Sequence, residues 1–283
     1  MSNSLSDHQV ESYRQDGFLS PLDILSPAEA LSFRKRFEFY EAEHGGWYEL
    51  SKGQKLYLLQ TWVAELASHE KVLDAVEGVL GANLMVWGSS LFVKDPGEGT
   101  YVSWHQDSTY WGLSEPDVTT AWIALSPATI ESGCMKMMPG THKWQQIEHV
   151  DSLNEKNLLT RGQEIAVDVN EADGVMVELA AGQMSLHDVR TVHASDPNQS
   201  SDRRIGVAIR YIAPHVRQIH AENDSAWLVR GEDAFTHFIH ETPPKQDMDV
   251  DALAEHARIL KLRQGVLYKG VEGKPAHDDP AAL

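Results

Sequence analysis

The chain has 283 residues, 42% of them hydrophobic, which is enough for one large domain with a packed core. Its 42 acidic and 24 basic residues give a formal net charge of −18, which argues against nucleic acid or an anionic membrane surface as a partner. The single cysteine, Cys134, excludes an intramolecular disulfide, and neither a signal-peptide pattern nor a run of 18 apolar residues is evident, so we expect a cytoplasmic protein.

The first part of the chain has the pattern of helices. Ser6 and Ser26 are each followed three residues later by Gln or Glu, which is the spacing of a capping box, and Pro27 suits the first position of a helix. A further helix is predicted over residues 68–80, where apolar residues recur at helical spacing before a glycine. The sequence therefore predicts a helical N-terminal part over about 5–81.

From about residue 84 the pattern changes to short β-rich runs between Gly, Pro, Asn and Asp. Strands are predicted over 84–93, 101–107, 118–125, 135–138, 164–169, 175–178, 183–187 and 204–212. Eight such strands favour a mainly β fold with flanking helices, built on a double-stranded β-helix (jelly roll, cupin-like) core over about 84–215. The long polar segment 142–163 is predicted to form a lid or a substrate loop. A helix over 250–264 and a mobile tail over 273–283 complete a single domain, 1–283.

The segment Trp104-His105-Gln106-Asp107 ends the second predicted strand. On a strand, His105 and Asp107 point to the same face. Two imidazoles and one carboxylate are the ligand set of non-haem Fe(II) oxygenases, and His193 supplies the second imidazole. Arg204, 11 residues further on, can bind a carboxylate through two hydrogen bonds. Because the chain has 14 histidines, a His-x-Asp pair also arises by chance and can be a simple hydrogen-bonded pair. We interpret it as a metal site because His193 and Arg204 follow in the same β region.

This set of residues predicts an oxygenase that depends on iron and 2-oxoglutarate. Fe(II) held by three protein ligands keeps three positions free, of which 2-oxoglutarate takes two and O2 the third. The distal carboxylate of 2-oxoglutarate would be anchored by Arg204. The expected reaction hydroxylates an unactivated C–H bond and releases succinate and CO2.

Residues 5–215 resemble the phytanoyl-CoA dioxygenase family in several motifs that occur in the family's order. The motifs are the opening segment 5–19, the metal motif 104–107, the Gly-Cys to Pro-Gly-Thr-His stretch within 131–142, and the distal motif 193–204. The resemblance implies a jelly-roll core with Fe(II), 2-oxoglutarate and O2 as reactants. It implies that His105, Asp107 and His193 bind iron and that Arg204 binds 2-oxoglutarate. Gln106, Trp122 and Ser195 are implied as neighbours of the co-substrate.

Two of these assignments have a competitor. His187 is a second histidine in the distal segment, but His193 has the family's spacing to the serine, asparagine and arginine that follow it. Alternation along the strand lets only one of Arg203 and Arg204 point inward, and the same spacing favours Arg204. The carboxylate of Asp107 distinguishes the chain from related halogenases, in which a small residue leaves room for chloride, so we expect hydroxylation.

The residues that bind the substrate are less clearly marked. Trp87, Tyr110 and Trp111 are candidates for an aromatic wall, although packing between the sheets explains them equally well. Arg210 has the same strand parity as Arg204 and is the candidate for an anionic substrate group.

A small polar, anionic metabolite is the expected substrate, such as an aminoalkylphosphonate or an osmolyte-like compound. An acyl-CoA or a natural-product intermediate is the alternative, although the phosphates of CoA usually require several Lys or Arg. A non-catalytic jelly-roll protein that binds a metal or a ligand is the competing functional class.

Overall fold

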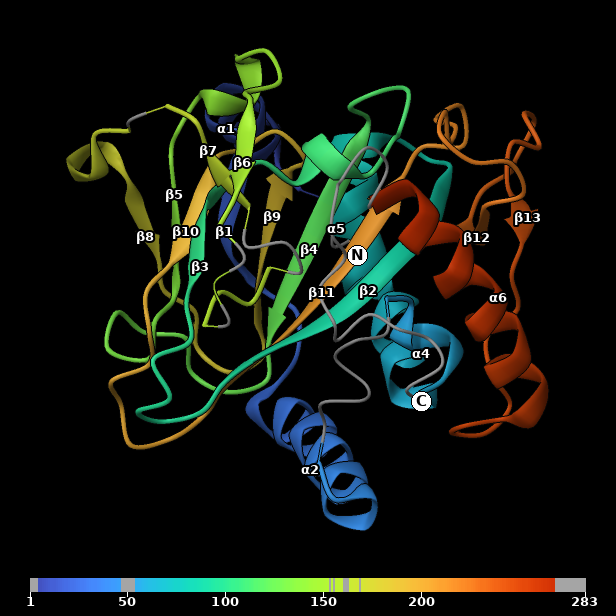
Figure 1. Cartoon of the computed structure of the whole chain (residues 1–283), viewed down its shortest axis with the longest axis horizontal. Helices are drawn as coiled ribbons and strands as arrows, with labels where there is room; N and C mark the ends of the chain where they lie inside the picture. The colour runs from blue at the N-terminus through green and yellow to red at the C-terminus, as the bar shows by residue number, and fades with distance from the viewer. Residues whose placement is uncertain are drawn as a thin grey trace.

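The structure, a computed structural model, describes residues 5–46, 54–152, 154, 156–159, 163–167 and 169–267. Two β-sheets form a jelly-roll core, as predicted, and helices flank it (Figure 1). The tail predicted over 273–283 lies outside the described residues. None of the helices in the described part of the chain combines the length and apolar character needed to cross a membrane.

The larger sheet has seven strands. In spatial order they are β1 (Phe18–Asp23), β9 (Gln183–Asp188), β4 (Val118–Ala124), β11 (Arg204–Ile212), β2 (Leu84–Lys94), β12 (Ser225–Arg230) and β13 (Ile239–His240). The smaller sheet has four, in the order β3 (Val102–His105), β10 (His193–Ser195), β5 (Met135–Met137) and β8 (Val175–Val177). A separate ribbon pairs β6 (His149–Asp151) with β7 (Gln163–Ile165). All of these strand pairs are antiparallel except β12 with β13.

The helices lie mainly before β2 in the sequence. They are α1 (Asp7–Asp16), α2 (Pro27–His44), α4 (Thr61–Ala67), α5 (Glu70–Leu80) and α6 (Val250–Leu267), with 3-10 helices η1 (Leu56–Leu58), η2 (Asp107–Tyr110), η3 (Thr141–Lys143) and η4 (Glu171–Asp173). The capping boxes predicted at Ser6 and Ser26 are both present. In Figure 1, α6 runs beside β12, on the opposite side of the molecule from β8.

Alternation along β11 explains how the larger sheet is divided into two faces. Its odd-numbered residues, Ile205, Val207, Ile209 and Tyr211, are buried in a core shared with α1, α2, α4 and α5. The even-numbered residue Ala208 packs in a separate cluster with Met135 and Met137 of the smaller sheet. The face of β11 that carries Arg204 and Arg210 therefore points into the space between the two sheets.

The eight predicted strands all have counterparts, but several boundaries differ. The strand predicted over 101–107 ends at His105, and the one predicted over 164–169 is β7, at Gln163–Ile165. The segment 142–163, predicted as a lid or loop, contains β6 in its described part. The prediction did not include β6, β10, β12, β13 and α4. Three of these, β6, β10 and β13, have at most three residues, which is too few to show an alternating pattern.

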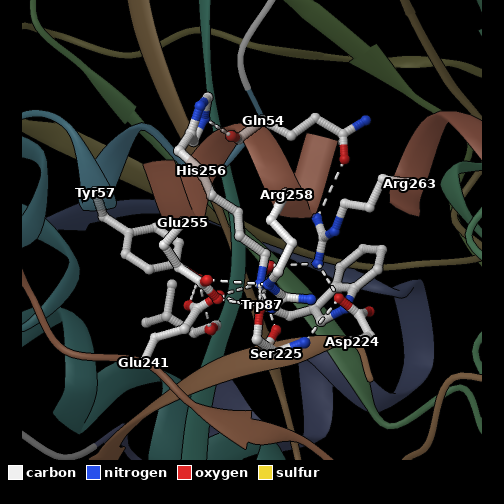
Figure 2. A network of polar contacts seen from close by, with 12 residues as sticks. Gln54, Tyr57, Trp87, Asp224, Ser225, Glu241, Glu255, His256, Arg258 and Arg263 are labelled. Atoms are coloured by element: carbon white, nitrogen blue, oxygen red, sulfur yellow. Dashed lines mark hydrogen bonds and ion pairs between the residues drawn. The ribbon is translucent and has the colours of Figure 1, made fainter. Parts of the chain in front are cut away.

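A buried polar network holds the segment from β12 to α6 against β2. The Lys55 ammonium, fully buried, donates to Glu241 and to the carbonyl oxygen of Ser225, and the Tyr57 hydroxyl also donates to Glu241. Figure 2 shows Glu241 and Ser225 with Tyr57 beside them. On α6, Arg263 donates to the carbonyl oxygen of Trp87 at 2.8 Å. These contacts join the segment around η1 to residues 225–241, and join α6 to β2.

The candidate metal and co-substrate site

The three predicted metal ligands meet between the two sheets. β3 and β10 are antiparallel neighbours, and their register pairs His193 with His105, so the two imidazoles come from adjacent strands. Their ring centroids are 4.1 Å apart. One ligand atom from each of His105, Asp107 and His193 lies within 4.8 Å of the others. Three protein donors gathered in this way leave the remaining positions of a bound ion open.

Asp107 reaches the site from a turn rather than from a strand. β3 ends at His105, and Asp107 begins η2, whose first turn is fixed because the Ser108 N–H donates to the carbonyl oxygen of Val189 at 3.1 Å. The intervening Gln106 has an extended backbone, with φ −109° and ψ 135°. His105 and Asp107 therefore still point to the same side, and Asp107 Oδ1 lies 3.5 Å from His105 Nε2.

Backbone carbonyls orient both imidazoles. The Nδ1–H of His105 donates to the carbonyl oxygen of Ser103 at 2.9 Å, and the Nδ1–H of His193 donates to that of Thr191 at 2.9 Å. With Nδ1 protonated in this way, each ring presents the lone pair of Nε2 to the site. Such outer hydrogen bonds are the usual means by which a histidine is held as a metal ligand.

The protonation states of the site suit a cation. Burial raises the pKa of Asp107, but contact with His105 and His187 outweighs it and holds that pKa well below its usual value. Burial, reinforced by the neighbouring His105 and His187 rings, lowers the pKa of His193 well below its usual value. At neutral pH the site thus offers a carboxylate and at least one neutral imidazole, which are the forms that bind divalent iron.

A buried arginine lies in the same pocket. Arg204 begins β11, is 1% exposed, and donates from Nη1 to the carbonyl oxygen of Gly133 at 2.7 Å. Its Nε has no hydrogen-bond partner among the described residues. Burial lowers the pKa of Arg204 to about 10, so it is charged at neutral pH. A buried guanidinium with an unused donor fits the distal carboxylate of 2-oxoglutarate, and the converging ligand atoms fit iron.

Two glycines make this placement of Arg204 possible. Trp122 stacks on its guanidinium, with Arg204 Cζ 5.2 Å from the ring centroid. The indole covers Gly206, where a Cβ would lie only 1.9 Å from Trp122 Cζ2. Gly133 has φ +73°, and a Cβ there would lie 2.1 Å from the carbonyl oxygen of Asp196.

The structure separates the two neighbouring arginines. Arg203 points outward from β11 and pairs with Glu41 and Asp95. Arg204, which the sequence pattern favours, points into the pocket. Because successive side chains of a strand point to opposite faces, the Arg203 guanidinium lies against α2 and the Arg204 guanidinium lies in the pocket.

The predicted neighbours of the co-substrate divide into two groups. Trp122 and Ser195 line the pocket, whereas Gln106 does not. The side-chain N–H of Gln106 donates to the carbonyl oxygen of Arg190 at 2.8 Å, and its Oε1 accepts from the backbone N–H of Ile147 at 2.9 Å. Gln106 is turned away because alternate residues of an extended segment point in opposite directions. Its contacts instead tie the metal motif to the segment after η3.

The predicted substrate residues are also divided. Arg210 lines the pocket, and Trp111 lies against it, with Arg210 Cζ 5.5 Å from the ring centroid. Trp87 packs behind Trp111, at 5.3 Å between ring centroids, and does not line the pocket. Its indole N–H donates to Asp224 at 2.7 Å. The side chain of Tyr110 lies outside the described part of the structure.

Sequence reasoning missed some of the pocket. The lining residues are Phe92, Val102, His105, Asp107, Thr120, Trp122, Met135, His187, His193, Ala194, Ser195, Arg204, Ala208 and Arg210. His187, rejected as a ligand in favour of His193, has its Nε2 3.9 Å from Asp107 Oδ2. It lies beside Thr120 because β4 and β9 pair these two positions. Knowledge of that pairing, together with strand parity, is the signal that would have found both residues.

Comparison with known proteins agrees with this geometry. The sequence profile of the phytanoyl-CoA dioxygenase (PhyH) family matches residues 13–206. A probable alpha-ketoglutarate-dependent hypophosphite dioxygenase from Stutzerimonas stutzeri is 32% identical over 154 residues, which is 53% of this chain and 53% of that protein. This chain thus aligns with about half the length of that relative. A methylphosphonate hydroxylase from Gimesia maris is 23% identical over 229 residues, covering 75% of this chain and 83% of the relative.

A solved structure extends the similarity over almost the whole chain. A non-haem monooxygenase, ThoJ in its apo form, matches with a TM-score of 0.82 and 35% identity, covering 92% of this chain and 98% of ThoJ. ThoJ has also been solved as a nickel complex. Because the PhyH profile spans more than half of the sequence and its metal and distal motifs meet in one pocket, the chain belongs to the phytanoyl-CoA dioxygenase family of iron- and 2-oxoglutarate-dependent oxygenases.

Proposed function

We propose that this protein hydroxylates a small anionic metabolite of the phosphonate type, and that Arg210 binds the anionic group. The main support is the environment of Arg210. Its Nη1 donates to the hydroxyl of Ser90 at 2.6 Å, while its buried Nε has no partner within the described chain. Burial lowers the pKa of Arg210 despite the opposing charge of Asp107, which indicates a cation that lacks a close anion.

The relatives give independent support for an oxyanion. Two of them are described as acting on hypophosphite and on methylphosphonate, both of which are small phosphorus oxyanions. An arginine is well suited to such groups because its planar fork can hold two oxygens at once. An acyl-CoA is less well supported, because its phosphates need several basic residues and, among the described residues, Arg204 and Arg210 are the two Lys or Arg side chains that line the pocket.

Each residue of the site then has a role. His105, Asp107 and His193 would hold Fe(II), and Arg204 would bind the distal carboxylate of 2-oxoglutarate. When bound, iron and 2-oxoglutarate supply the oxidising chemistry, in which O2 is consumed, succinate and CO2 are released and a C–H bond is hydroxylated. Arg210 would orient the substrate from the same face of β11.

Apolar side chains also line the pocket. Phe92, Met135 and Ala208 add apolar surface to the lining of the pocket. A pocket that is mainly apolar with a few placed charges both orients a small substrate and strengthens its ionic contacts.

The test is an anaerobic titration of the iron-loaded protein with 2-oxoglutarate, followed by addition of a small panel of anions. The weak visible charge-transfer band reports the iron and 2-oxoglutarate complex. Methylphosphonate, 2-aminoethylphosphonate and hypophosphite are then compared with acetate and a neutral amide. We expect a phosphorus oxyanion to perturb the band and, once O2 is admitted, to increase the release of succinate.

The matched variant is Arg210→Met, which keeps a long apolar side chain and removes the charge. It should keep the band with 2-oxoglutarate but lose most of the response to the oxyanion, by about 10-fold or more in apparent affinity. An oxyanion response that is the same in wild type and Arg210→Met contradicts the role of Arg210. A folded wild type that never shows the band contradicts the iron and 2-oxoglutarate chemistry itself.

A further inference from the structure

A second buried basic side chain stands directly beside Arg204. Lys94 ends β2, and the register of the antiparallel pair β2 and β11 places it opposite Arg204. Residues opposite each other in such a pair have their side chains on the same face. Lys94 is fully buried, and Arg204 is 1% exposed.

The Lys94 ammonium is directed at Ser195. Its Nζ lies 2.6 Å from Ser195 Oγ, 3.0 Å from the carbonyl oxygen of Ser195 and 2.5 Å from that of Asp196. Three N–H bonds therefore meet three acceptors. Ser195 itself lines the pocket, whereas Lys94 does not. Lys94 can therefore influence a ligand in the pocket through its hydrogen bond to Ser195, without contacting the ligand itself.

Neither of these two basic side chains has an internal counter-ion. Within the described residues, no carboxylate forms an ion pair with Lys94 or Arg204 at 4.0 Å or less. Burial, and then the charge of Arg204, lowers the pKa of Lys94 to about 6, with only partial compensation from the exposed Asp196. Two like charges buried together are unfavourable unless an anion joins them. With a pKa of about 6, Lys94 is largely uncharged at pH 7 without a neighbouring anion, and a carboxylate that enters next to Arg204 supplies the negative charge that favours its ammonium form.

We propose that Lys94 is a positioning residue for 2-oxoglutarate, which acts on the distal carboxylate of the co-substrate through Ser195. A charged Lys94 donates to Ser195 Oγ, so the hydroxyl proton of Ser195 is free to point into the pocket. Ser195 and Arg204 then donate to the same carboxylate, while Lys94 adds positive charge behind them. This inference concerns the co-substrate and is independent of the identity of the substrate.

The experiment compares two 2-oxo acids in the anaerobic, iron-loaded protein. 2-Oxoglutarate carries the distal carboxylate, and 2-oxovalerate lacks it but binds iron through the same 2-oxo acid group. Affinities are read from the visible charge-transfer band. In wild type we expect a strong preference for 2-oxoglutarate. In Lys94→Met the affinity for 2-oxoglutarate should fall on the order of 10- to 100-fold, while that for 2-oxovalerate should barely change.

The coupling to Ser195 is tested with a double-mutant cycle. If Lys94 acts through Ser195, then Ser195→Ala removes most of the same preference, and Lys94→Met adds little to it. Independent, multiplicative losses would overturn the coupling. Equal weakening of both 2-oxo acids in Lys94→Met would overturn the proposal, since a purely structural role affects both.

Two further variants keep the result interpretable. Lys143→Met is the control, because Lys143 is exposed and donates to the carbonyl oxygen of Gln15, away from the pocket-lining residues, so it should leave both affinities unchanged. Lys94→Arg keeps the charge and should retain more of the preference than Lys94→Met. If Lys94→Met does not fold, Lys94→Gln is used for the same comparison, and an unchanged preference in that variant would refute the proposal.

Discussion

The missing side chain of Gly206 determines how Arg204 is presented. The Trp122 ring occupies the space that a Cβ at this position would fill, and the same ring stacks on the Arg204 guanidinium. The arginine is therefore held from one side by the indole and from the other by the carbonyl oxygen of Gly133. A glycine that is not among the residues lining the pocket thus affects how the Arg204 guanidinium is placed.

Gly206→Ala tests this arrangement. The added methyl group forces the Trp122 ring to move, so we expect the free energy of unfolding to fall by about 1–3 kcal/mol and the affinity for 2-oxoglutarate to fall with it. Chemical denaturation and anaerobic titration measure the two effects. Gly265→Ala is the matched control: among the described residues, no atom outside its chain neighbours and its own helix backbone lies within 4 Å of a Cβ there, and alanine is the better helix former, so stability should rise slightly. Unchanged 2-oxoglutarate binding in Gly206→Ala would contradict the role of Trp122.

The sequence predicts the metal ligands and Arg204 better than it predicts the other residues in and around the pocket. The residue types and spacing of His105, Asp107, His193 and Arg204 are specific, and the structure brings all four together. Lys94 and His187 gave no comparable signal, because a lysine or a histidine in a strand is most often exposed or structural. Their positions follow from strand pairing, which a single sequence does not reveal.

At the level of elements, the C-terminal part is joined to the core by charges rather than by apolar packing alone. Lys55 precedes η1, and Glu241 follows β13, and both side chains are almost completely buried. Glu241 also accepts hydrogen bonds from Tyr57 and from the hydroxyl of Ser225 (Figure 2). Removing one member of such a pair leaves the other charge buried without compensation. This lowers the free energy of unfolding more than replacing both members by uncharged residues does.

Lys55→Met is expected to destabilise the protein by about 3–5 kcal/mol, because Glu241 remains buried as an uncompensated carboxylate. The double variant Lys55→Met/Glu241→Gln should recover part of that loss, since no net charge is left in the site. Lys71→Met, at an exposed position on α5, serves as control and should change stability by less than about 0.5 kcal/mol. Urea denaturation measures all three. Equal losses in the single and double variants would show that the pair contributes packing rather than charge.

The elements that the sequence predicts well are those with local signals. α1 and α2 have capping boxes, and β11 has nine residues with a clear buried pattern. By contrast, β12 is a partly exposed strand outside the predicted core, and α4 has seven residues without a side-chain cap. Both are held by distant partners, so their positions depend on tertiary contacts that local propensity does not encode.

On the scale of the whole molecule, the net charge of −18 contrasts with the cations inside the pocket. The surface repels a dianion such as 2-oxoglutarate at long range, and the pocket attracts it only at short range. Salt screens the long-range part, since the screening length falls from about 30 Å at 0.01 M to about 10 Å at 0.1 M.

The association rate of 2-oxoglutarate should therefore increase with ionic strength over this range. Stopped-flow measurement of the charge-transfer band provides the rate. 2-Oxovalerate, with one carboxylate instead of two, is the comparison and should show a shallower slope. A rate that falls as salt is added would mean that the pocket, and not the acidic surface, governs the encounter.

The contact between Lys55 and Glu241 joins residues that are 186 positions apart in the chain. The hydrogen bond between His256 and the carbonyl oxygen of Gln54 spans 202 positions. During synthesis on the ribosome, the segment around Lys55 emerges long before its partners exist, and its ammonium has to stay in water until they arrive. The contacts that join the Lys55 segment and β2 to the C-terminal residues therefore cannot all form until nearly the last turn of α6 has left the exit tunnel. A chain that stops before Glu241 should remain incompletely folded and be bound by chaperones or degraded by proteases.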